Sequence, residues 1–151
     1  MAGTSIFMQC LEGVRDVIRA LDLTGLPDNC VVIRRRPHDG SNYFPGITVH
    51  PSQERYSGGT TAREAVGYGC AVTMIVNNDN DKDYLLDRLL TWRETIRRKF
   101  VEKGALTGVT SGDVYTLKVE HEEVLDWNRL KHDNLDACAL CIRPFVLETR
   151  T

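Results

Sequence analysis

The stretch from Val66 to Val76 places the strongest constraint on what this chain can fold into. Its bulky residues recur at every second position, which is the period of a β-strand; they are Val66, Tyr68, Cys70, Val72, Met74 and Val76. Between them lie small residues at one end of the stretch, Gly67, Gly69 and Ala71. Two faces of such different size predict a sheet with a bulky core on one side and a closely approaching element on the other.

Two helices are expected, one before and one after this strand. The first begins at Ile6, with Thr4 or Ser5 as its cap, because apolar residues recur at three- and four-residue steps: Ile6, Phe7, Cys10, Leu11, Val14, Val17, Ile18 and Leu21. The second covers Lys82–Phe100 and carries an apolar stripe of Leu85, Leu86, Leu89, Leu90, Ile96 and Phe100. It ends in Arg97, Arg98 and Lys99, which complement the helix dipole.

Four further strands complete the predicted order. Cys30–Arg36 and Gly46–His50 precede the central strand, and Val114–His121 and Leu135–Arg143 follow the second helix. Pro144 cannot donate a ladder hydrogen bond, so the pairing should bulge or end there. The resulting order α-β-β-β-α-β-β predicts an α+β fold, with a mainly antiparallel sheet covered by two helices. A chain of 151 residues fits a single domain over residues 1–151.

The connection Pro51–Ala65 is too long for a plain hairpin turn. Connections beyond about 12–15 residues are usually functional or disordered, and this one holds Arg55, Tyr56 and Arg63, residue types common at protein interfaces. The alternatives are an idle flexible loop and a projecting arm, at about 51–65, that becomes ordered against a partner. We favour the arm.

Composition and charge disfavour several classes of protein. Charged residues make up 26% of the chain, but its net charge is −2 and its pI is near 6.1. A general binder of nucleic acid or anionic membranes would normally be basic. Four charged residues interrupt the apolar segment 6–21, which argues against a signal peptide or membrane span. Five cysteines without a secretory signal favour a reduced, cytosolic setting.

No metal or cofactor site is predicted. Cys138 and Cys141 have the spacing of a zinc or redox pair, but a separation of three in a strand puts them on opposite faces. We therefore interpret them as buried core thiols. The acidic segment 79–83 resembles the start of a calcium loop, yet Tyr84 and Leu90 stand where that loop requires Gly and Glu.

No catalytic motif is present either, so the chain is not expected to be an enzyme. His38, His50, His121 and His132 sit in no recognisable nucleophile motif. The segment 58–61 (Gly-Gly-Thr-Thr) lacks the lysine of a phosphate-binding loop. Arg34 and Arg36 share one face of their strand; a solvated strand end and an intersubunit salt bridge are both open interpretations.

The order of elements at this chain length resembles the tail-terminator and tail-completion (neck) proteins of tailed bacteriophages. The stretch around Ala137–Leu147 resembles the final sheet strand of that family, and Pro51–Ala65 its projecting hairpin loop. The resemblance implies a structural virion protein, a homohexameric ring at the head-proximal end of the tail. Such a ring terminates tail-tube polymerisation and joins the tail to the head connector, so it takes part in viral tail assembly and head–tail joining.

The resemblance also implies partners and a location. The partners are other copies of the chain, the tail-tube protein and the head–tail connector or head-completion protein, with the tail sheath as a further candidate. DNA passes through the lumen without specific contact, no membrane is involved, and the virion is assembled in the bacterial host cytoplasm.

Eight residues are predicted to bind these partners: Arg34, Arg36, Arg55, Tyr56, Arg63, Arg97, Arg98 and Lys99. Two alternatives remain open. A small ligand-binding or catalytic α+β domain would have a pocket with converging polar groups. A nucleic-acid-binding module would retain DNA in a salt-dependent way.

Overall fold

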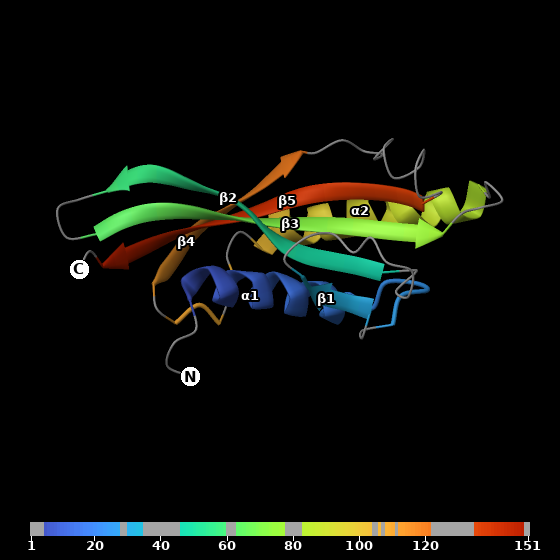
Figure 1. The fold of residues 1–151 in the computed structure, drawn as a ribbon, viewed down its shortest axis with the longest axis horizontal. Helices are drawn as coiled ribbons and strands as arrows, with labels where there is room; N and C mark the ends of the chain where they lie inside the picture. Colours follow the sequence, from blue (N-terminus) through green and yellow to red (C-terminus); the bar gives the residue numbers. More distant parts are fainter. Residues whose placement is uncertain are drawn as a thin grey trace.

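The predicted order of helices and strands is confirmed in the computed structural model (Figure 1). The structure describes residues 5–27, 30–34, 46–59, 63–77, 83–103, 106, 108–110, 112–121 and 135–149. Its elements are α1 (Ile6–Ala20), β1 (Val31–Ile33), β2 (Gly46–Gly59), β3 (Arg63–Asn77), α2 (Asp83–Lys103), β4 (Asp113–His121) and β5 (Leu135–Thr149). The fold is therefore α+β.

The described strands form one sheet in the order β1-β2-β3-β5-β4. β1 and β2 are parallel, and the other three pairings are antiparallel. β3 lies at the centre and pairs with both β2 and β5. Both of its faces are buried from Ala65 to Val76.

Both helices pack on the same face of the sheet, which we call the core face. α1 contacts β1, β2 and β3, whereas α2 contacts β3, β4 and β5. The hydroxyl of Ser5 accepts a 3.0 Å hydrogen bond from the Met8 amide and caps α1. The bulky residues of β3 point into this core, as the period of two predicted: Val66, Tyr68, Cys70, Val72, Met74 and Val76.

The buried stripe of α2 differs from the predicted one. Leu89, Ile96 and Phe100 are buried as expected, together with Trp92, which was not in the predicted stripe. The remaining three leucines of that stripe, Leu85, Leu86 and Leu90, are only half-buried. The indole of Trp92 donates to the Thr24 carbonyl oxygen at 2.9 Å, so the helix turns this ring toward the segment that follows α1.

The prediction of a long loop over Pro51–Ala65 was wrong. β2 continues to Gly59 and β3 begins at Arg63, and the two strands pair as a hairpin with Tyr56 opposite Val66. From Pro51 to Tyr56 both alternating sets of side chains are exposed, so no hydrophobic periodicity marks this part of the strand. We call this paired extension, Pro51–Gly59 of β2 with Arg63–Cys70 of β3, the hairpin arm. In Figure 1 it projects beyond both helices.

Two other strands differ in length from the prediction. β1 ends at Ile33 rather than Arg36, and Arg36 lies outside the described residues. β5 neither ends at Arg143 nor stops at Pro144, but continues to Thr149. Its pairing with β3 skips Arg143 and Pro144 and resumes at Phe145 in the same register, since proline has no backbone N–H to donate.

Candidate assembly interface

The second face of the sheet, which we call the small-residue face, carries Gly67, Gly69 and Ala71 of β3. Neither α1 nor α2 packs against it. Side chains of the neighbouring strand β5 occupy the space instead. A Cβ atom on Gly67 would lie 2.6 Å from Cε1 of Phe145, and one on Gly69 would lie 3.1 Å from the Arg143 guanidinium. The closely approaching element predicted from the sequence is thus a pair of side chains from within the sheet.

Arg143 is 2% exposed and joins four strands. Its Nε donates to Oε1 of Glu120 on β4 at 2.6 Å, and its Nη2 donates to Oε2 at 3.4 Å. Its Nη1 donates to the carbonyl oxygens of Gln53 on β2 and, at 3.3 Å, of Gly67 on β3. Arg55 adds a second guanidinium 3.2 Å from Oε1 of Glu120. The hydrogen bond from Arg143 is the main reason why the pKa of Glu120 is lowered.

The hairpin arm carries a second set of cross-strand contacts. Nη2 of Arg63 lies 2.5 Å from Oδ2 of Asp113, so the arm is tied to β4 across β5. On the core face, the Tyr68 hydroxyl donates to Oε2 of Glu148 at 2.5 Å. Burial and this bond raise the pKa of Tyr68. The arm is therefore held to the rest of the sheet by side chains as well as by its backbone ladder.

The predicted partner-binding residues do not form one surface. Arg55 and Arg63 share the small-residue face of the arm, whereas Tyr56 lies on the other face and is 72% exposed. Arg34 follows the edge strand β1, and its amide donates to the Val49 carbonyl. The three basic residues near the end of α2 belong to the helix layer: Arg97, Arg98 and Lys99. Arg98 forms an exposed pair with Glu94 at 3.7 Å.

Sequence reasoning missed Arg143 and Glu120. A signal was available, because Arg143 is the one charged residue in the apolar stretch 137–147. A charged side chain inside an apolar strand needs a partner of opposite charge. The identity of that partner depends on strand pairing, which the sequence does not display.

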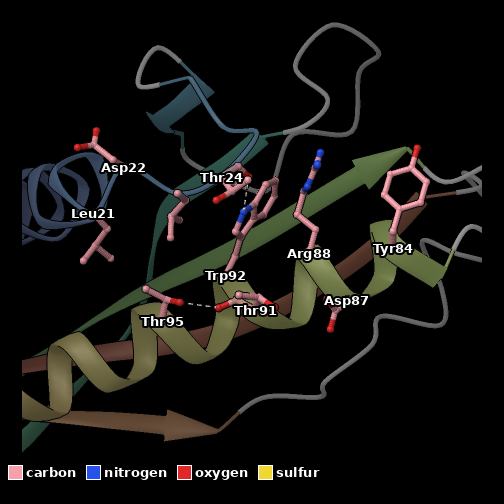
Figure 2. A pocket seen from close by; sticks show the side chains of 10 residues that line it. Leu21, Asp22, Thr24, Tyr84, Asp87, Arg88, Thr91, Trp92 and Thr95 are labelled. Carbon is pink, nitrogen blue, oxygen red and sulfur yellow. Dashed lines mark hydrogen bonds between the residues drawn. The ribbon is translucent and has the colours of Figure 1, made fainter.

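A cleft of about 440 Å³ lies between the segment after α1 and the first half of α2 (Figure 2). Trp92 and Thr24, which are joined by a hydrogen bond, line it together with Tyr84 and Arg88. Figure 2 shows the carboxylates of Asp22 and Asp87 pointing away from each other. Polar groups are therefore present in the cleft, but these two do not converge on a common point.

The cysteines lie in the core or in the sheet. None of the five forms a disulfide. Cys138 points into the core cluster on the core face, and Cys141 lies on the opposite face, as predicted. Burial raises the pKa of Cys10 and of Cys138 to about 12, and that of Cys70 well above its usual value.

Among the described residues, no cluster of three or more His, Cys, Asp or Glu side chains could hold a metal ion. No helix in the described ranges has the length and apolar character needed to cross a bilayer.

Comparison with known proteins gives one informative result. No protein-family model and no curated protein matches this sequence. Among solved structures, the chain is similar to one described as "Virion of native gene transfer agent (GTA) particle", with a TM-score of 0.64 and 13% identity. The match covers 96% of this chain and 99% of that one. The two chains share a fold.

Proposed function

We propose that this chain is a structural virion protein that forms a ring at the head-proximal end of a phage-type tail. The ring terminates tail-tube polymerisation and joins the tail to the head connector. The observation that carries this proposal is the fold shared with a chain of a gene transfer agent virion, over nearly the full length of both chains. The order of elements, which resembles tail-terminator and neck proteins, supports the same function.

A ring requires contacts between two different surfaces of each copy, repeated until the circle closes. The hairpin arm and the opposite edge of the sheet supply two such surfaces at separate places on the molecule (Figure 1). Of the predicted partner-binding residues, Arg55, Tyr56 and Arg63 lie on the arm. We assign this arm to contacts between copies, and Arg97, Arg98 and Lys99 to contacts with other tail or neck proteins.

The other proposed partners are the tail-tube protein and the connector or head-completion protein, in a hexamer within the virion. A net charge of −2 fits a ring through which DNA passes without specific contact, since tight phosphate binding relies on lysine and arginine. The chain is proposed to act as one domain and without enzymatic activity.

Light scattering and negative-stain imaging of the purified chain test this proposal. The expected result is a closed ring of six copies with an open centre, and caps on the ends of tail tubes when tubes are added. A protein that stays monomeric at high concentration and leaves tubes uncapped would contradict the proposal. Retention of DNA at low salt would instead favour a nucleic-acid-binding module.

The cleft beside Trp92 supports one alternative, a small ligand-binding or catalytic domain. Its volume of about 440 Å³ lies within the range of small-molecule sites. A thermal-shift screen with small polar compounds, run on the wild type and on an Arg88→Ala variant, tests it. Stabilisation of the wild type that is lost in the variant would favour this alternative over the ring.

A further inference from the structure

The sheet has two open edges among the described strands. β1 covers the outer side of β2 only at Ile47–Val49. From His50 to Gly59, no other described strand pairs with that side of β2. At the far end of the sheet, β4 pairs only with β5 among the described strands. The open part of β2 and the open side of β4 are of similar length.

The two open edges belong to the same rows of paired residues, which run across the sheet from strand to strand. One row of paired residues runs from Tyr56 through Val66 and Val146 to Val114. The next row runs from Arg55 through Gly67 and Phe145 to Thr116. Because three antiparallel pairings separate β2 from β4, these two strands run in opposite directions. A second copy placed beside the first would therefore bring β4 antiparallel to β2.

We infer that the outer edge of β2 in one copy pairs with the outer edge of β4 in the next, so that the sheet continues from copy to copy. This inference rests on the proposed ring and identifies the contact that would build it. The contact joins two different edges, as a closed ring requires. An exposed edge with unpaired backbone groups is a template for this kind of strand addition.

Exposed aromatic side chains support this pairing. Of the large apolar side chains that are exposed on described strands, Tyr56 is 72% exposed and Tyr115 is 47% exposed. Tyr56 lies on the open edge of β2, and Tyr115 is the bulged residue between Val114 and Thr116 on β4. Both tyrosines therefore belong to the same rows of the sheet at the two open edges, with Tyr56 on the core face and Tyr115 beside Phe145 of the small-residue face. Tyrosine is enriched where proteins meet.

Bulges interrupt both edges, between Pro51 and Glu54, between Tyr56 and Gly59, and at Tyr115. Bulges protect natural edges against unselective pairing. We therefore expect a short backbone ladder that depends on matching side chains.

A pair of engineered cysteines tests the contact directly. In the double variant Tyr56→Cys/Val114→Cys, the two thiols of one chain are three strand spacings apart, about 14 Å, which exceeds the roughly 7 Å limit for the Cα atoms of a disulfide. Mild oxidation is expected to link copies into a ladder of covalent multimers well beyond the dimer. The ladder should collapse on reduction. Each single variant can link at most two copies through its new thiol.

The matched control is Tyr56→Cys/Thr116→Cys, in which the two thiols lie on opposite faces of the sheet. We expect no ladder from it, and none from the wild type, which sets the background of the native cysteines. Equal ladders from both double variants would reveal random collision and overturn the inference. If no ladder forms while light scattering shows the wild type as a ring, the edge contact is wrong and the ring stands. If no ladder forms and the wild type stays monomeric without capping tubes, both are wrong.

Discussion

Nε of Arg143 lies 2.6 Å from Oε1 of Glu120, with the arginine side chain 2% exposed and the glutamate side chain 24% exposed. The same guanidinium donates to the carbonyl oxygen of Gln53 on β2, within the bulge between Pro51 and Glu54 where the hairpin arm begins. This pair therefore couples the position of the arm to the opposite edge of the sheet. A change in the charge of either residue should therefore destabilise the centre of the small-residue face.

Removing Glu120 should destabilise the protein strongly. Glu120→Ala leaves the buried Arg143 without its carboxylate, and breaking a buried pair in this way costs about 3–5 kcal/mol. Urea unfolding measures the loss. Glu94→Ala, which breaks the exposed pair with Arg98, is the control and should cost less than about 1 kcal/mol. Equal effects of the two substitutions would contradict the importance assigned to Arg143.

The Arg143–Glu120 pair should also make stability depend on pH. Because the folded-state pKa of Glu120 is lowered, mainly by Arg143 with Arg55 and Lys118 adding to it, its stabilising contribution is complete above the unfolded value of about 4.3. The contribution is lost as pH falls through the lowered folded value. Denaturation of the wild type and of Glu120→Gln across this range should show their difference in stability shrinking toward acid. If the difference in stability between the two proteins did not change with pH, protonation of Glu120 would not be coupled to unfolding as proposed.

A side chain at Gly69 should strain the sheet. A Cβ atom there would lie 2.7 Å from the carbonyl oxygen of Gln53, which belongs to the backbone and cannot rotate away. Gly69→Ala should cost about 1–3 kcal/mol, the range for overpacking. At Gly67 the atoms nearest to the added one belong to the buried side chains of Phe145, at 2.6 Å, and Arg143, at 2.9 Å, so Gly67→Ala should be destabilising as well. Thermal unfolding that shows either variant to be as stable as the wild type would count against this geometry.

Trp92 should contribute through its hydrogen bond as well as through its burial. Trp92→Phe keeps a buried ring but leaves the Thr24 carbonyl without the indole N–H that bonds it at 2.9 Å, and we expect a loss of about 1–3 kcal/mol. Thr95→Ala on the same helix removes a hydroxyl that bonds only the Thr91 carbonyl. It should change stability by less than about 0.5 kcal/mol. Denaturant titration of both variants distinguishes them.

Thiol reactivity should separate Cys30 from the other cysteines. Cys10, Cys70 and Cys138 are buried with raised pKa values, and Cys141 is also buried. Since the thiolate is the reactive form, a thiol reagent at mildly alkaline pH should label only Cys30 rapidly. Cys30→Ser should abolish the rapid phase, and denaturant should release the remaining thiols. Rapid labelling of Cys138 in the folded protein would show that the core opens.

The prediction of the fold succeeded where burial leaves a periodic pattern. The alternation from Val66 to Val76 marked the central strand because one of its faces packs against both helices. The same logic failed over Pro51–Ala65, because the polar side chains on both faces of β2 are exposed from Pro51 to Tyr56 and leave no hydrophobic alternation to read. It also missed Trp92, whose burial depends on the segment that follows α1.

The sequence by itself determined the order of the elements, the core face of β3 and the opposite directions of Cys138 and Cys141, because each follows from local spacing along the chain. Only the tertiary structure decided that Arg143 meets Glu120, that the arm is a paired hairpin, and that the open edges of β2 and β4 lie level. These relationships join residues that are distant in sequence. They depend on strand order and register, which the spacing within one segment does not encode.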